Sequence, residues 1–349
     1  MNIAAAFFLL LLSAPPARAG AGSEALPFLK LDAGARGAAL SGAYCAAGDD
    51  ALSVFYNPAG TALTAKKEIL LAHNEWLEGL RNETMAYVHP IGPRLTAFGG
   101  FNALFSGSMN RYNSVGYKTG TFNAMEAAVS AGVSVGFGLD YFGGAAVKVL
   151  SQQAAGGKAS AWAGDAGLLK AAGDWRIGVS ASNFGGRLKF GSRGFELPLI
   201  LRAGVSRNFL QNYMVTVESV KAGRAAAASA LGAEARVHSG PKEYFFLRAG
   251  YKTGRSRNAG PGFTAGVGLT NRDLRVDYAF APYGDLGDAH RVTVALRFGE
   301  LRPEEVPEHP QLPPVRGYNR VKPTSLLEEP KKEKKKKKKK AAGDDYFMW

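Results

Sequence analysis

Residues 291–298, RVTVALRF, carry the alternation that decides the fold. Apolar side chains occupy every second position: Val292, Val294, Leu296 and Phe298. The positions between them hold Arg291, Thr293 and Arg297. Since side chains on a β-strand point alternately to opposite faces, the stretch predicts a strand with one apolar and one polar face. A soluble sandwich with its apolar face inward fits this alternation as well as a membrane barrel does.

Similar runs fill the chain from residue 68 to residue 298, and each is about 9 to 13 residues long, as expected for tilted membrane strands. We expect about fourteen of them. They cover residues 70–77, 82–88, 95–105, 124–135, 141–150, 160–170, 175–182, 199–206, 214–220, 228–237, 244–252, 263–270, 274–280 and 291–298.

The connections favour the barrel. Short ones (90–93, 136–139, 171–173, 209–212, 238–242 and 271–273) alternate with longer ones such as 106–121, 183–197, 254–261 and 282–288. Barrels with one periplasmic and one outer rim show this alternation, and closure leaves no unpaired strand edge in the lipid. We therefore predict an all-β fold, a transmembrane antiparallel β-barrel over residues 67–299. An even strand number leaves both chain ends in the periplasm.

A different kind of segment precedes the strands. Residues 28–63 read FLKLDAGARGAALSGAYCAAGDDALSVFYNPAGTAL, rich in Gly and Ala and ending in an Asn-Pro turn signal. Such a segment cannot bury enough apolar surface to fold alone. We predict that residues 20–66 form a plug inside the barrel, with a helical turn or two at 51–55.

The acidic pair Asp49-Asp50 of this plug could serve acid–base chemistry, but pairing with cations of the barrel wall is the favoured interpretation. The candidate cations on the polar face of the strands are Arg248, Arg275, Arg291 and Arg297.

The order of FLK, GARG, the acidic pair and NPAG in residues 28–60 resembles the N-terminal segment of the PorV/PorQ family of outer-membrane proteins. It is more distantly similar to the bacterial long-chain fatty-acid transporters. The resemblance implies plug or gate roles for Arg36, Asp49, Asp50, Asn57, Pro58 and Ala59. In those transporters the plug lies against a kinked third strand that opens the wall, which points to Gly99 and Gly100 here. Alternatively, these two glycines merely make room for the plug or for a neighbouring side chain.

The resemblance implies a non-enzymatic protein. Its partners would be outer-membrane lipid and, in type IX-like protein secretion, secretion components or the secreted cargo that it shuttles. The alternative is a plug-gated transporter of fatty acids or other hydrophobic small molecules. The final strand, with Val292, Val294, Leu296 and Phe298, resembles the terminal signal by which barrels are recognised for insertion.

The two ends of the chain differ from the barrel. Residues 1–19 combine an apolar run at 4–12 with Ala17-Arg18-Ala19, the pattern of a secretory signal peptide. We therefore expect the outer membrane of a diderm bacterium. Residues 300–349 form a Pro/Lys-rich tail with nine lysines at 331–340, predicted to be disordered in the periplasm. The net charge of +14 suggests nucleic acid, which we discount because the chain is exported and has no nucleic-acid module.

Few residues suggest reaction chemistry. Cys45 is the one cysteine, which excludes an internal disulfide and predicts a small buried residue in the plug. The histidines (His73, His89, His238, His290 and His309) follow no metal-binding spacing, and no GxSxG motif occurs. We therefore expect no catalytic residues, no metal and no cofactor.

Overall fold

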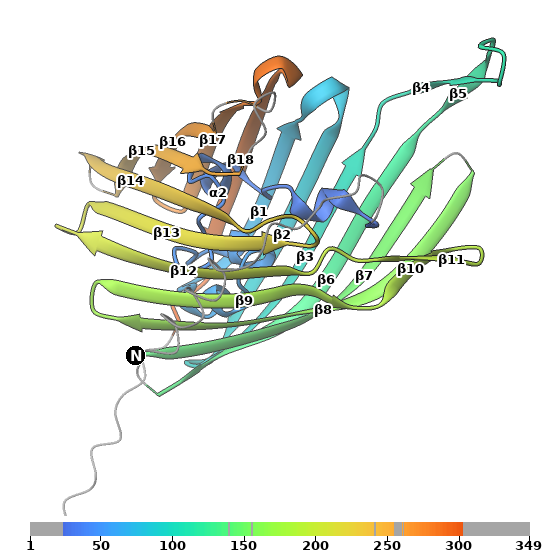
Figure 1. Ribbon diagram of the computed structural model, residues 1–349. Coiled ribbons are helices and arrows are strands. Elements are labelled where there is room, and N and C mark those ends of the chain that lie inside the picture. The colour runs from blue at the N-terminus through green and yellow to red at the C-terminus, as the bar shows by residue number, and fades with distance from the viewer. Residues whose placement is uncertain are drawn as a thin grey trace, which may run out of the picture. The chain divides into compact units, whose positions relative to one another are not determined.

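The computed structural model describes residues 24–302, except residues 139, 155, 241, 255–259 and 261. These residues form a closed antiparallel barrel of 14 strands (Figure 1). The strands are β1 (Lys67–Glu75), β2 (Arg81–Ile91), β3 (Leu95–Phe105), β6 (Ala124–Phe137), β7 (Tyr141–Ala154), β8 (Gly157–Ala172), β9 (Trp175–Gly185), β12 (Ile200–Phe209), β13 (Tyr213–Ala222), β14 (Ala228–Gly240), β15 (Glu243–Lys252), β16 (Phe263–Asn271), β17 (Leu274–Pro282) and β18 (Asp288–Phe298). Pairing of β1 with β18, from Lys67↔Phe298 to Glu75↔His290, closes the barrel. The predicted fold class is confirmed.

The first strand and two connections differ from expectation. Strand β1 ends at Glu75 rather than at residue 77, because Glu78 and Gly79 adopt positive φ angles of 56° and 70° in a 3-10 turn, η4 (Leu77–Gly79). Two long connections predicted as loops each contain a small hairpin. These are β4 (Met109–Tyr112) with β5 (Lys118–Phe122), and β10 (Arg187–Phe190) with β11 (Arg193–Glu196).

The connections define two rims. The short-turn rim comprises the connections at 92–94, 138–140, 173–174, 210–212, 241–242 and 272–273. The long-loop rim comprises those at 76–80, 106–123, 155–156, 186–199, 223–227, 253–262 and 283–287, including η6 (Gly284–Leu286). Both small hairpins extend from the long-loop rim (Figure 1). Apart from the tight 155–156 turn, the predicted alternation of short and long connections holds.

The outward face of the wall is apolar. In β18, Val292, Val294, Leu296 and Phe298 are 42%, 40%, 45% and 39% exposed, whereas Arg291 and Thr293 are each 1% exposed. Exposed aromatic residues follow the short-turn rim, among them Tyr141, Trp175 and Tyr213. Exposed apolar side chains on every strand, with aromatic residues near the rim, are typical of a barrel wall that contacts lipid. No helix among the described residues is long and apolar enough to cross a membrane.

The segment before β1 lies in the lumen. It contains η1 (Pro27–Lys30), α2 (Ala35–Ala39), η2 (Ala51–Phe55) and η3 (Pro58–Leu63). Only the turn at 51–55 was predicted, because Ala- and Gly-rich pieces of four to six residues show no helical periodicity. Asp50 and Asn57 begin the last two turns, each accepting a hydrogen bond from the backbone N–H two residues later.

This segment crosses the lumen from rim to rim. The Ala25 N–H donates to the Glu196 carbonyl at the long-loop rim, and the Lys66 ammonium pairs with Asp273 at the short-turn rim, 2.8 Å away. Glu24 therefore lies at the opposite rim from Phe298, whereas the even strand count predicted both ends at one rim. An even number of strands places residues 67 and 298 at the same rim. It does not locate residue 24, because residues 24–66 pass through the barrel.

The predicted signal peptide at 1–19 and the lysine run at 331–340 lie outside the described residues. Of the predicted tail, residues 300–302 are described. There the Arg302 backbone N–H donates to the Ala65 carbonyl at 2.8 Å, and its guanidinium contacts Ala62 and Thr96. The chain thus keeps contact with the plug for a few residues past β18.

Candidate functional site

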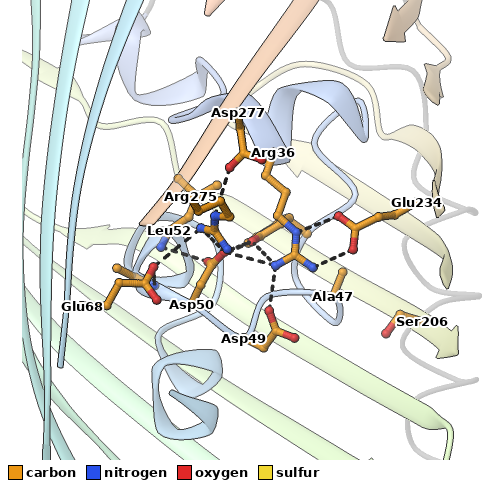
Figure 2. Close-up of polar contacts among 12 residues, drawn as sticks. Arg36, Ala47, Asp49, Asp50, Leu52, Glu68, Ser206, Glu234, Arg275 and Asp277 are labelled. Atoms are coloured by element: carbon orange, nitrogen blue, oxygen red, sulfur yellow. Dashed lines mark hydrogen bonds and ion pairs between the residues drawn. The ribbon is translucent and has the colours of Figure 1, made fainter. Parts of the chain in front are cut away.

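Arg36 of α2 is the centre of the contact between plug and wall (Figure 2). The side chain is 7% exposed. Its Nε and Nη2 donate to Glu234 of β14 at 2.9 and 3.1 Å, while Nη1 donates to Asp49 at 2.7 Å and Asp50 at 3.1 Å. A guanidinium suits this position because its planar fork presents five N–H donors in fixed directions.

The pairing continues into the wall. Asp50 accepts from Arg275 of β17 at 2.8 Å, and Arg275 also lies 3.0 Å from Asp277. Arg248 of β15 joins Glu234 at 2.6 Å to Asp277 at 2.7 Å.

Two further ion pairs complete the set. Arg297 pairs with Glu68 at 2.9 Å, and Arg176 pairs with Asp49 at 3.1 Å. We call the ten side chains the lumen ion network: Arg36, Asp49, Asp50, Glu68, Arg176, Glu234, Arg248, Arg275, Asp277 and Arg297. Its five arginines balance its five carboxylates, which is the condition under which charges can be buried.

The acidic pair of the plug is held ionised. Burial raises the pKa of Asp49, but the charges of Arg36 and Arg176 outweigh burial and place the pKa well below its ordinary value. Burial also raises the pKa of Asp50, and Arg275 and Arg36 reverse the shift, so that its pKa is lowered. A general acid or base works best with a pKa near the operating pH. The geometry therefore favours structural pairing over acid–base chemistry.

Only one of the four wall cations proposed for the pair contacts it, and this is Arg275. Arg248 and Arg297 pair with other carboxylates of the network. Arg291 is 1% exposed and has no carboxylate partner within the described part of the chain; its guanidinium lies over the Trp76 ring, 5.2 Å from the centroid. Arg176 contacts Asp49 but was not among the predicted cations, because the sequence does not show which polar-face arginine of the barrel meets the plug.

Asn57, Pro58 and Ala59 lie against β7 and β8. The Asn57 amide donates to the Leu168 carbonyl of β8 at 3.2 Å and to the Cys45 carbonyl at 2.9 Å. The wall opposite carries glycines: a Cβ on Gly167 would lie 2.0 Å from Asn57 Oδ1, and one on Gly144 would lie 2.5 Å from the Pro58 carbonyl carbon. The resemblance places this stretch against the third strand; η3 does contact β3, but the closest approaches of Asn57 and Pro58 to the wall are to β8 and β7.

No β-bulge interrupts β3 at Gly99 and Gly100. The strand keeps unbroken register with β2 and β6. A Cβ on Gly100 would lie 2.8 Å from both Val54 Cγ1 of the plug and Ser130 Oγ, whereas one on Gly99 would meet nothing closer than 3.6 Å. Gly100 thus makes room for the plug, the alternative noted for these glycines. The register shifts of the barrel lie instead between β8 and β9, at Gly164/Asp165, and between β14 and β15, at His238/Gly240.

A second, apolar contact zone joins the plug to the wall near the long-loop rim. We call it the apolar chamber; Leu26 and Phe28, both essentially fully buried, fill it. They pack against the inner face of β6, β7 and β8 and against the β10–β11 hairpin. The buried residues on that side are Ala128, Leu150, Ala159, Ala161, Ala163, Leu188 and Leu197.

Two of the hollows on the described barrel lie outside the apolar chamber, which is itself filled by packed side chains. An apolar groove of about 490 Å³, the outer groove, is lined by residues of β6, β7, β8, β9 and β12 such as Val133, Val135, Gly143, Ala145, Leu168 and Val179. A polar hollow of about 490 Å³, the vestibule, lies at the short-turn rim and is lined by Arg176, Arg236, Arg248, Arg272, Tyr244 and Phe246 among others. At Gly144 and Gly167, which have no side chain, only the backbone of the wall lies between the outer groove and Asn57 and Pro58 of the plug.

Cys45 is buried in the plug, as predicted, with its Sγ 3.6 Å from Ser180 Oγ. Burial raises the pKa of its thiol well above the ordinary range, which makes the thiol unreactive. Within the described residues no group of three or more His, Cys, Asp or Glu side chains is placed to hold a metal ion. His309 lies outside those residues.

Comparison with known proteins identifies one matching family model and solved structures of similar fold. Residues 17–185 match the model of an uncharacterised protein family, UPF0164. No curated protein matches the chain.

Among solved structures, the Ralstonia pickettii toluene transporter TbuX aligns with a TM-score of 0.53 and 16% identity over 77% of this chain and 100% of its own. The CymD monoaromatic hydrocarbon channel aligns with a TM-score of 0.56 and 12% identity over 77% of this chain and 98% of its own. A Pseudomonas aeruginosa FadL homologue aligns with a TM-score of 0.52 and 10% identity over 76% of this chain and 98% of its own.

These likenesses support the distant resemblance to fatty-acid transporters and do not support the PorV/PorQ name or a secretion role. At 10–16% identity they show the fold alone. In fold, the chain is similar to the FadL-type hydrocarbon transporters, and its first half matches UPF0164.

Proposed function

We propose that this protein is a plug-gated transporter that passes a hydrophobic small molecule across the outer membrane. One observation carries the proposal: an apolar chamber inside the barrel and an apolar groove outside it lie along the same strands, β6, β7 and β8. Asn57 and Pro58 of the plug lie directly inside the wall at Gly144 and Gly167, which also line the outer groove. The titles of the structural neighbours, a toluene transporter and a monoaromatic hydrocarbon channel, name cargo of this class.

The apolar chamber suits apolar cargo because an apolar ligand can replace the contacts that Leu26 and Phe28 make with the wall. Leu26 and Phe28 are held there by packing, and an apolar ligand entering from the long-loop rim makes equivalent contacts with Leu150 and Leu188. The chamber therefore serves as the entry site, and the outer groove, which faces lipid, serves as the exit. Transport requires the plug to shift away from Gly144 and Gly167.

The lumen ion network keeps the plug in place at the other side of the lumen. Breaking a buried ion pair by separating its partners leaves uncompensated charge and is strongly unfavourable. The plug therefore moves with Arg36, Asp49 and Asp50 still paired, so that the shift is centred on Asn57 and the η3 turn that follows it, rather than on α2 or the acidic pair. The lumen ion network is therefore the fixed part of the gate.

A reversible tether tests the gate. In a Cys45→Ala background, Thr61→Cys together with Ser134→Cys places two cysteines where η3 meets β6, since the two hydroxyl oxygens lie 2.7 Å apart. Uptake of radiolabelled toluene into vesicles containing the oxidised protein should fall to that of protein-free vesicles and recover on reduction. The matched control carries Cys45→Ala with Thr61→Cys alone and should be insensitive to oxidation.

Three outcomes count against the proposal. The first is wild-type uptake equal to that of empty vesicles. The second is equal uptake by the tethered protein before and after reduction, once mass spectrometry has verified the disulfide. The third is copurification of secreted proteins or of a secretion pore with a protein that shows no uptake, which would support the secretion role.

A further inference from the structure

We propose that the vestibule at the short-turn rim binds a small molecule bearing an oxyanion, a carboxylate or a phosphate. The cavity of about 490 Å³ is lined by seven arginines but only three acidic residues. This chemistry differs from that of the apolar chamber and of the outer groove, so the site adds to the proposed transport of apolar cargo and does not depend on it.

The charges that line the vestibule do not cancel. Five of the seven arginines belong to the balanced lumen ion network, which leaves Arg236 and Arg272. Asp174 is the one lining carboxylate outside the network. The lining and the network together therefore carry one positive charge in excess. Positive charge in a concave, partly desolvated site attracts and concentrates anions.

The two arginines outside the network have donors to offer. The Arg236 guanidinium donates to the Gln211 carbonyl at 2.6 Å and to Asn212 Oδ1 at 3.4 Å, which are neutral acceptors. Within the described residues neither Arg236 nor Arg272 forms an ion pair with a carboxylate. Guanidinium groups bind carboxylate and phosphate through paired, charge-assisted hydrogen bonds, which makes an oxyanion the natural partner.

Aromatic side chains orient two of the arginines that line the vestibule, one outside the network and one within it. The Arg236 guanidinium lies over the Tyr244 ring at 5.2 Å, and Arg248 lies over Phe246 at 5.0 Å. Arg236 and Phe246 are cross-strand partners of β14 and β15, so cation and ring lie side by side on the inner face. Stacking restricts the rotation of each guanidinium, and the rings add an apolar surface. The vestibule thus offers a charged patch beside an aromatic wall, which fits an organic acid with a small apolar body.

Binding to the purified full-length protein in a nonionic detergent tests the proposal by calorimetry. The probes are benzoate, inorganic phosphate and benzyl alcohol, a neutral molecule of similar size to benzoate. Benzoate or phosphate should bind with an affinity that falls as NaCl is raised, because screening weakens charge pairing. The Arg236→Ala/Arg272→Ala double variant should weaken binding about tenfold or more. The control, Arg187→Ala, removes an exposed arginine of the β10–β11 hairpin at the other rim and should bind as the wild type does.

The outcomes separate the possibilities. Benzoate binding without phosphate binding identifies an organic-acid site, and equal binding of both identifies a simple oxyanion site. Equal affinity of the double variant and the wild type overturns the proposal, as does binding of benzyl alcohol as tight as that of benzoate. Heat-modifiable mobility on gels verifies that each variant is folded. Toluene uptake is a separate readout that the double variant should leave unchanged, so failure of one proposal is distinguishable from failure of the other.

Discussion

The plug meets the barrel wall in two regions that use opposite chemistry. On the side of β14, β15 and β17, Arg36 and the acidic pair are embedded in buried ion pairs with the wall. On the side of β6, β7 and β8, Leu26 and Phe28 pack against small and aliphatic side chains. One segment of about forty residues thus has a charged anchor and an apolar anchor.

In the proposed gate, the two contact regions would differ in how strongly they resist movement of the plug. A buried charge has one set of acceptable partners, because any arrangement that leaves it unpaired is heavily penalised. Apolar contacts are non-directional and are satisfied by any apolar surface, a ligand included. The charged region is therefore suited to hold the plug and the apolar region to release it.

Loss of the charged anchor should have the largest effect. Arg36→Ala leaves Glu234, Asp49 and Asp50 without their shared cation, and removal of one partner of a buried pair typically costs about 3–5 kcal/mol. Urea unfolding in micelles, followed by tryptophan fluorescence, measures the change. Arg187→Ala serves as the exposed control. Equal stability of the two variants would mean that the network does not hold the plug.

Loss of an apolar anchor should have a smaller and more local effect. Leu26→Ala removes a fully buried side chain from the apolar chamber and should destabilise by about 2 kcal/mol, the low end for such truncations, because a segment at the rim can relax. Hydrogen exchange read by mass spectrometry should show faster exchange in residues 25–31 with no change in α2. Faster exchange in α2 as well would show that the two anchors are coupled, contrary to the comparison above.

Substitutions at the adjacent wall glycines Gly99 and Gly100 form a matched pair, and their effect on stability should be smaller than that of Leu26→Ala. Gly100→Ala brings a Cβ to 2.8 Å from Val54 of the plug, and such overpacking costs about 1 kcal/mol where flexible side-chain ends can move. Gly99→Ala meets nothing within 3.5 Å and should be neutral or slightly stabilising. The same unfolding measurement compares them. The reverse order would mean that Gly100 serves strand geometry rather than plug contact.

Change of pH should have the smallest effect over the neutral range. Arginine partners lower the pKa of Asp49 and of Asp50, so their contribution to stability is fully present above the unfolded-state value of about 4 and is lost as the pH falls toward the folded-state values. Stability should stay constant from pH 8 to pH 5 and decline below about pH 4. In Asp49→Asn the decline should be smaller. A titration of plug stability near pH 6 would contradict the ion pairing described for this pair.

Much of the barrel was predictable because strand periodicity is local. Every barrel strand was predicted to within a few residues of its observed bounds. The signals were the alternation in β17 and β18 and, elsewhere, runs of apolar and aromatic residues between turns. The miss at the end of β1 has a local cause, since Glu78 adopts a left-handed conformation that its residue type does not announce. The hairpins β4–β5 and β10–β11 were missed because strands of four or five residues are too short for their alternation to stand out from a loop.

The sequence alone determined which face of each strand is apolar, that residues 28–63 could not fold unaided, and that the acidic pair needs cations. Only the tertiary structure decided which cations these are, that Asn57 and Pro58 lie against Gly144 and Gly167, and that Glu24 lies at the rim opposite Phe298. The physical reason is the range of the interactions. Alternation along a strand involves neighbouring residues, whereas contacts between Arg36 and Glu234, or between Asp50 and Arg275, join residues about two hundred positions apart whose meeting depends on how the barrel closes around the plug.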